Sequence, residues 1–154
     1  RKITISTAGV VSKIYKMADD RLPYKLAISL NAPNNTIRKR IMPLTNNNPI
    51  EELIKSADYY YSKLKRFVTF EYVLLNNIND SEKCATELID LLKNIPCKLN
   101  LIPYNEIGGK FSRPGNQSID TFIDILKNAP FTVTVRWSKG TKIDAGCGQL
   151  AVKN

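Results

Sequence analysis

The sequence predicts an α/β fold: a largely parallel sheet with flanking helices. Five runs rich in β-branched and aromatic residues alternate with segments whose apolar residues follow helical spacing. Each strand-plus-helix unit takes roughly 30 residues, as a parallel strand–helix–strand repeat requires. Hydrophobic residues make up 43% and charged residues 24% of the 154 residues, which is typical of a folded domain and excludes a disordered chain.

The first half of the chain supplies three of the expected strands. Short runs at 2–6 and 24–30 are rich in Ile, Leu and Thr, and turn-forming residues follow each of them. The third strand, at 66–75, is the longest apolar run. We expect Asn35 and Thr36 to cap a short helix. Between these strands we expect helices at 10–17, 35–41 and 50–65, and a polar loop at 42–49.

The second half repeats the pattern twice. Asp80 and Ser81 are typical helix caps, and the apolar residues after them follow helical spacing. The fourth strand is expected at 97–102. Ser118 is expected to cap the next helix, and the fifth strand follows at 131–136. Five strands alone leave an open sheet and a barrel as alternatives, and in both, ligands bind at the carboxyl ends of the strands.

The charge of the chain favours an anionic partner. Lys and Arg number 23 against 14 Asp and Glu, a net charge of +9, and residues 1–77 carry 13 of the basic but only 6 of the acidic side chains. Such a surplus fits nucleic acid, although a solvated basic surface is the alternative. There is no histidine, which excludes Ser–His and Cys–His nucleophile pairs. No apolar run approaches the roughly 18–20 residues of a membrane span, so we expect no membrane contact.

The three cysteines do not form a recognisable framework. Cys84, Cys97 and Cys147 are odd in number and lack CxxC spacing, so the usual zinc and iron–sulfur motifs are absent and a reducing compartment is expected. Cys84 and Cys97 lie in apolar surroundings and are expected in the core or on a helix surface. Cys147 lies between two glycines, which leaves two alternatives: a reactive thiol on a permissive backbone, or an incidental one in a tail.

Polar residues follow three of the expected strands. STAG at 6–9, Ser29 with Asn31, and Asn105 all come where a strand ends. Parallel strands bring these positions to one edge, so a polar ligand is expected there rather than three separate helix caps. Basic residues that are candidates for phosphate contacts, with a solvated surface as the alternative, are Arg38, Lys39, Arg40, Lys139 and Lys142.

Six strings occur in one order along the chain: STAGVV (6–11), LAISLNAPN (26–34), IMP (41–43), EYVLL (71–75), CKLNLIPYN (97–105) and IDAGCGQLA (143–151). Together they resemble the carboxy-terminal part of the radical S-adenosylmethionine methyltransferases that modify adenine in RNA. The match is strongest to the enzymes that make 2-methyladenosine in large-subunit ribosomal RNA and, in bacteria, in some transfer RNAs. The resemblance spans nearly all of the chain.

That resemblance implies a fold and a set of site residues. The fold is a partial (β/α) barrel, here missing its first strands, and residues 1–154 form the carboxy-terminal part of its core. Ser6, Ser29, Leu30 and Asn105 match positions that contact S-adenosylmethionine. Asn31 stands where the bacterial enzymes usually have histidine, so its contact is expected through the main chain alone.

The resemblance also implies the chemistry. Cys147 matches the cysteine that accepts a methyl group from one S-adenosylmethionine. A second molecule is cleaved to a radical that activates this S-methyl for addition to adenine, and a partner cysteine then resolves the protein–RNA adduct. Radical chemistry suits the electron-poor C2 of adenine, which does not attack an electrophilic methyl group. This route needs no histidine.

The remaining functional parts that the resemblance implies are expected before Arg1, which is not an initiating Met. They are the amino-terminal RNA-binding domain, the CxxxCxxC motif of the [4Fe–4S] cluster, the resolving cysteine that forms the disulfide, and a general-base glutamate. We therefore expect the 154 residues alone to ligate no cluster and to be inactive. The whole protein is expected to be a monomer that acts on ribosomal RNA, and on tRNA as a further substrate, in the cytoplasm or in an organelle of a eukaryote.

Three alternatives accompany this expectation. The sister enzymes that methylate C8 of the same adenine share the Cys-Gly-Gln-Leu ending at 147–150. A non-catalytic RNA-binding relative lacking the cluster is the second alternative. An unrelated α/β domain is the third, and six ordered matches argue against it.

Overall fold

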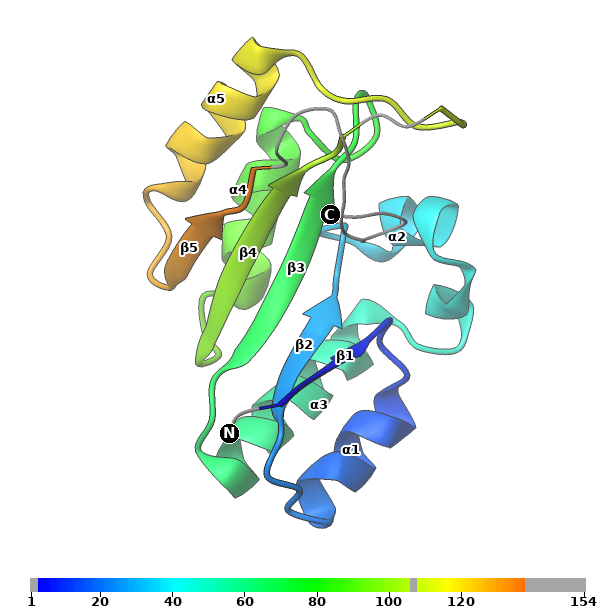
Figure 1. The fold of residues 1–154 in the computed structure, drawn as a ribbon, viewed down its shortest axis with the longest axis vertical. Helices are drawn as coiled ribbons and strands as arrows, with labels where there is room; N and C mark the ends of the chain where they lie inside the picture. Colours follow the sequence, from blue (N-terminus) through cyan, green and yellow to red (C-terminus); the bar gives the residue numbers. More distant parts are fainter. Residues whose placement is uncertain (1–2, 106–107, 138–154) are drawn as a thin grey trace.

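The structure is a computed structural model that describes residues 3–105 and 108–137. Within these ranges one five-stranded sheet is flanked by α-helices (Figure 1). The elements in chain order are β1 (Thr4–Thr7), α1 (Val11–Asp19), β2 (Lys25–Ser29), α2 (Asn35–Ile41), the 3-10 helix η1 (Pro43–Asn46), α3 (Ile50–Leu64), β3 (Val68–Leu74), α4 (Glu82–Leu92), β4 (Cys97–Pro103), α5 (Asn116–Leu126) and β5 (Thr132–Val135). None of the described helices is long and apolar enough to cross a membrane.

The sheet is parallel throughout, and its spatial order β1-β2-β3-β4-β5 is the order of the chain. Crossovers between parallel strands are almost always right-handed, so strands added in one direction place their helices on one face. Figure 1 shows α3 and α4 on the same side of the sheet, behind the strands. The predicted parallel α/β architecture is confirmed, and one face of the sheet carries no described helix.

The core lies between the sheet and the helices. Phe70, Tyr72 and Leu74 alternate along β3 and are fully buried on the helix side. The ring of Tyr72 lies 5.5 Å from that of Phe122 in α5, and its hydroxyl donates to the carbonyl of Asn79. β3 is the central strand of the order given above. Its odd-numbered side chains point to the face of the sheet opposite the helices.

Three local expectations were wrong. Asn34, not Asn35 or Thr36, caps α2: its Oδ1 accepts from the amide of Ile37. Helix α5 begins at Asn116 after Gly115, before the expected cap at Ser118, and no side chain caps it. The loop expected at 42–49 contains η1, because Pro43 at its first position has the φ that a helical turn needs.

Candidate functional site

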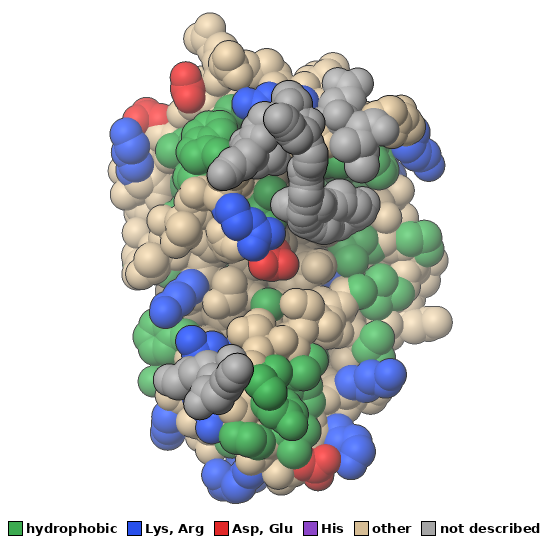
Figure 2. All heavy atoms as spheres, in the orientation of Figure 1, with side chains coloured by type: hydrophobic (Ala, Val, Ile, Leu, Met, Phe, Trp, Pro, Cys, Tyr) green, Lys and Arg blue, Asp and Glu red, His purple; other side chains and the backbone are tan. Residues whose placement is uncertain are grey.

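A row of polar side chains crosses the face of the sheet on which no described helix packs. Ser29, Glu71, Asn100 and Thr134 are register partners on β2, β3, β4 and β5. Their strand neighbours on β2, β3 and β4 are buried among the helices, so these side chains point the other way. Figure 2 views this face, on which basic side chains are more widespread than acidic ones. We call these four residues the polar row.

The polar row is rich in hydrogen-bond acceptors. Asn100 Oδ1 is buried and has no donor among the described residues. Glu71 is 24% exposed, and its Oε2 lies 4.0 Å from Nη1 of Arg136, too far for a hydrogen bond. A ligand with ammonium or hydroxyl groups would supply the missing donors.

The carboxyl ends of the strands bring three of the expected site residues to one edge. Ser6 is exposed near the end of β1, Ser29 is half-buried at the end of β2, and Asn105 is half-buried just after β4. These positions share an edge because all the strands run in the same direction. Their contact with S-adenosylmethionine stays a prediction.

Asn31 uses its polar groups within the protein. Its φ of 60° is left-handed, a conformation that asparagine tolerates better than most residues. Its Oδ1 accepts from the amide of Val73 at 2.9 Å, and its carbonyl accepts from Nδ2 of Asn79 at 2.8 Å. The side-chain oxygen therefore joins the end of β2 to β3, and the expected main-chain contact with the cofactor stays a prediction.

Leu30 lies in the hydrophobic core with no exposed surface. Its amide donates to the carbonyl of Glu71, and its carbonyl accepts from Nε of Arg38. Both main-chain groups thus have partners inside the protein. The expected cofactor contact of Leu30 stays a prediction.

Arg38 does not contact solvent, so its expected role in binding RNA phosphate is wrong. It is 0% exposed. Its Nη2 donates to the carbonyls of Ala8 and Ser29 at 2.7 Å each, and its Nη1 donates to Oγ1 of Thr45 at 3.2 Å. Burial lowers the pKa of the guanidinium to about 10. Instead of contacting a phosphate, the guanidinium of Arg38 links the end of β1 to the end of β2.

The remaining basic candidates divide into two groups. Lys39 and Arg40 are exposed on α2, which lies beside the end of β2 (Figure 1), and their contact with RNA stays a prediction. Lys139, Lys142 and the candidate methyl carrier Cys147 lie outside the described residues.

A second, smaller apolar cluster lies at the carboxyl ends of β3 and β4. Val73, Leu75, Ile102 and Tyr104 are buried together, and the ring of Phe111 lies 6.3 Å from that of Tyr104, edge to face. Val73 and Ile102 are on the same face as the polar row. This face therefore has an apolar area next to polar groups, as small-molecule sites commonly do.

No described residues form a metal site: in residues 3–105 and 108–137 no three Asp, Glu or Cys side chains gather. Cys84 and Cys97 are both buried free thiols, so of the two placements expected for them, the core or a helix surface, the structure shows the core. Burial raises the pKa of Cys97 to about 11, so this thiol is not nucleophilic at neutral pH.

Three residues of this region were not identified from the sequence: Glu71, Asn100 and Asn79. A signal for the first two exists, because Thr69 with Glu71, and Lys98 with Asn100, place polar residues at alternate positions between apolar ones. Asn79 lies in a loop, and nothing local distinguishes it. It is nevertheless fully buried and holds the ends of β2 and β3 together.

No protein-family model matches the sequence. Individual relatives do. The chain is 47% identical to a protein of Caldanaerobacter subterraneus named "Probable dual-specificity RNA methyltransferase RlmN", over 99% of this chain and 45% of the relative. It is homologous to part of an RlmN-type RNA methyltransferase. A protein of Nitrosopumilus maritimus named "Ribosomal RNA large subunit methyltransferase N" is 46% identical over 97% of this chain and 43% of the relative.

The same relationship holds for the fold. The crystal structure of a radical SAM methyltransferase from Sphaerobacter thermophilus superimposes with a TM-score of 0.88 at 43% identity, over 96% of this chain and 43% of that chain. The expected resemblance to radical S-adenosylmethionine methyltransferases is thereby confirmed. The chain spans less than half the length of the relatives it matches.

Proposed function

We propose that the full-length protein containing this chain methylates C2 of an adenine in large-subunit ribosomal RNA, and in tRNA, by a radical S-adenosylmethionine mechanism. The observation that carries the proposal is the 47% identity over 99% of the chain to an RlmN-type protein. Its proposed place is the cytoplasm, and its proposed state is a monomer. The net charge of +9 supports an RNA substrate.

The sheet face that carries the polar row and the carboxyl edge of the sheet together offer groups that fit S-adenosylmethionine. This cofactor carries an ammonium group, ribose hydroxyls and an adenine amine. The polar row offers the carboxylate of Glu71 and the Oδ1 of Asn100, which has no donor among the described residues. Ser6, Ser29 and Asn105 add polar groups at the same edge, and the apolar cluster around Val73 suits the faces of a purine.

When bound, S-adenosylmethionine supplies the methyl group and, with a [4Fe–4S] cluster that the full-length protein is proposed to ligate outside this chain, the radical. The residues of this chain have three proposed tasks. The strand ends orient the cofactor, Cys147 holds the methyl group as a thioether, and exposed Lys39 and Arg40 beside the strand ends attract RNA phosphate.

The test is methyl transfer by the full-length protein. After anaerobic reconstitution with iron and sulfide, the enzyme is incubated with unmodified large-subunit RNA and isotopically labelled S-adenosylmethionine, and the modified nucleoside is identified by mass spectrometry against 2-methyladenosine and 8-methyladenosine standards. We expect 2-methyladenosine. Formation of 8-methyladenosine would instead assign the protein to the sister activity, and RNA binding without any methylation would make it a binding protein.

Cys147→Ala separates the proposed methyl-carrier role of the thiol from RNA binding. We expect this variant to produce no methylated RNA while its RNA affinity stays within about twofold of wild type, because the thiol carries the group and adds little to binding. Cys84→Ala is the matched control and should retain methylation, since its thiol is buried. Unchanged product formation by Cys147→Ala would refute the carrier role.

A further inference from the structure

Arg38 joins three segments that are far apart in the sequence. Its guanidinium donates to Ala8 after β1, to Ser29 and Leu30 at the end of β2, and to Thr45 in η1. The three carbonyls belong to the strand ends that carry the candidate cofactor residues. Arg38 itself has no exposed surface.

A buried cation without a carboxylate partner is unfavourable unless it serves as a donor. No described acidic side chain lies within ion-pair distance of Arg38, and removal of a charge from water costs several kcal/mol. Where strands end, carbonyls lose the partners that the sheet provided. The planar guanidinium satisfies three of them at once from nitrogens spread over a rigid fork, whereas lysine carries its three donors on a single nitrogen.

Gly9 is part of the same arrangement. A Cβ built on Gly9 would lie 2.9 Å from Nη2 of Arg38, and the φ of Gly9 is +105°, where only glycine is unstrained. The glycine of the STAG string is thus explained by close approach of the guanidinium to the end of β1.

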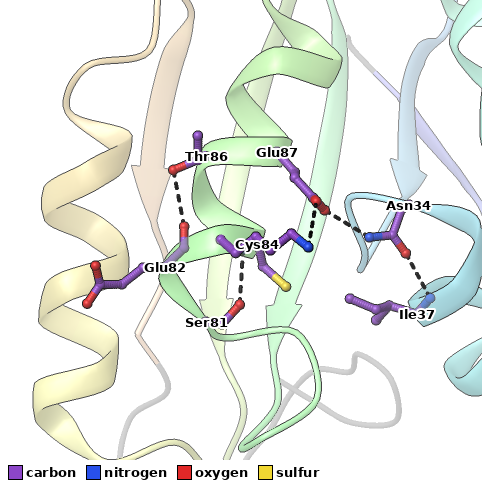
Figure 3. Close-up of polar contacts among 8 residues, drawn as sticks. Asn34, Ile37, Ser81, Glu82, Cys84, Thr86 and Glu87 are labelled. Carbon is purple, nitrogen blue, oxygen red and sulfur yellow. Dashed lines mark hydrogen bonds and ion pairs between the residues drawn. The ribbon is translucent and has the colours of Figure 1, made fainter.

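Helix α2 is held in place by contacts other than those of Arg38. Figure 3 shows Asn34 at its amino terminus, where Nδ2 donates to Oε1 of Glu87 in α4 at 2.9 Å while Oδ1 accepts from Ile37. The next residue, Asn35, donates to Glu51 and accepts from the amide of Ile50 in α3. Replacement of Arg38 therefore removes the link between strand ends while the contacts that dock α2 remain.

We propose that Arg38 is a positioning residue for S-adenosylmethionine: it fixes the main chain of Ala8, Ser29 and Leu30 in the conformation that binds the cofactor, without touching the cofactor. This inference rests on the proposed function. It predicts that cofactor affinity depends on the forked geometry of the side chain and not on its charge alone.

The experiment compares three variants of the reconstituted full-length protein by isothermal titration with S-adenosylmethionine. Arg38→Lys keeps the charge and should weaken cofactor binding about tenfold or more, with RNA affinity unchanged. Thr36→Ala, at an exposed position of α2, should bind like wild type. Asn34→Ala removes the cap of α2 and lowers stability without touching the guanidinium, so its cofactor affinity should stay within about threefold of wild type.

The outcomes separate the two proposals. Wild-type protein that binds no S-adenosylmethionine overturns the proposed function and this inference with it. If wild type binds and Arg38→Lys binds equally well, only the inference is overturned. The same holds if Asn34→Ala loses as much affinity as Arg38→Lys, since the effect is then one of general stability. Should Arg38→Lys not fold, Arg38→Gln, which keeps two donors, is measured by the same criteria.

Discussion

Gly9→Ala tests whether the close approach of the Arg38 guanidinium requires glycine at position 9. The added Cβ would meet Nη2 of Arg38 at 2.9 Å and Cδ1 of Leu53 at 3.3 Å, with the backbone at φ +105°. Positive φ costs a non-glycine residue about 1–3 kcal/mol. Displacement of the guanidinium weakens its bonds to Ala8 and Ser29, which adds about 1.5–3 kcal/mol. We expect a total loss of about 2.5–6 kcal/mol in the free energy of unfolding.

The matched control is Gly109→Ala. Gly109 has a similar φ of +119°, but an added Cβ would meet nothing within 4 Å. It therefore carries only the backbone cost, about 1–2 kcal/mol in an exposed loop that can relax. Both variants are compared with wild type by urea denaturation of the full-length protein, followed by far-UV circular dichroism.

The double variant identifies the partner in the close contact. Combining Gly9→Ala with Arg38→Lys removes the atom that the new methyl group would contact. The double variant should therefore lose at least about 1 kcal/mol less stability than the sum of the losses in the two single variants. Two results would refute the reasoning: equal losses for Gly9→Ala and Gly109→Ala, or additive losses in the double variant.

Two further predictions concern buried groups of the described chain. Asn79→Ala should lower the free energy of unfolding by about 3–5 kcal/mol. The reason is that three main-chain groups lose a hydrogen-bond partner: the amide of Leu75 and the carbonyls of Val73 and Asn31. A loss under about 1 kcal/mol in urea denaturation would contradict this. Cys97 has a pKa raised by burial to about 11, so above pH 9 its thiol ionises in the unfolded chain first. Relative to Cys97→Ala, the free energy of unfolding of wild type should fall by about 2 kcal/mol between pH 9 and 11, and a flat difference would contradict it.

The sequence was sufficient to predict the sheet because its signal is repeated. Each strand carries its own apolar run and each helix its own spacing, so β3 at Val68–Leu74 lies within the predicted run 66–75 and β4 begins at the predicted Cys97. Helix ends were less predictable. Gly115 precedes α5 without a side-chain cap, so the capping residues that usually mark a start were absent.

The fate of single charges could not be predicted from composition. Arg38, Lys39 and Arg40 are adjacent in the sequence, yet the first is fully buried and the others are exposed. The difference is one of helical phase: Arg38 precedes half-buried Ile41 by three residues and shares its face of α2. Helical phase does not reveal that carbonyls from the ends of β1 and β2 contact Arg38 on that face, because those contacts span up to 30 residues of chain.

The polar row also determines what kind of structure can pack on the face of the sheet that carries no described helix. Parallel sheets are almost always covered on both faces, and in a doubly wound fold a second layer of helices packs there against apolar side chains. Such helices would bury the carboxylate of Glu71 beside the already buried Oδ1 of Asn100, and neither oxygen has a hydrogen-bond donor among the described residues. A cavity that receives a donor-rich ligand carries no such penalty. The side chains of the polar row thus favour the interior of a barrel over a second helix layer. The double variant Glu71→Leu with Asn100→Leu should therefore stabilise the fold and abolish the binding of S-adenosylmethionine. Retained binding, measured by titration, would refute this assignment of the face.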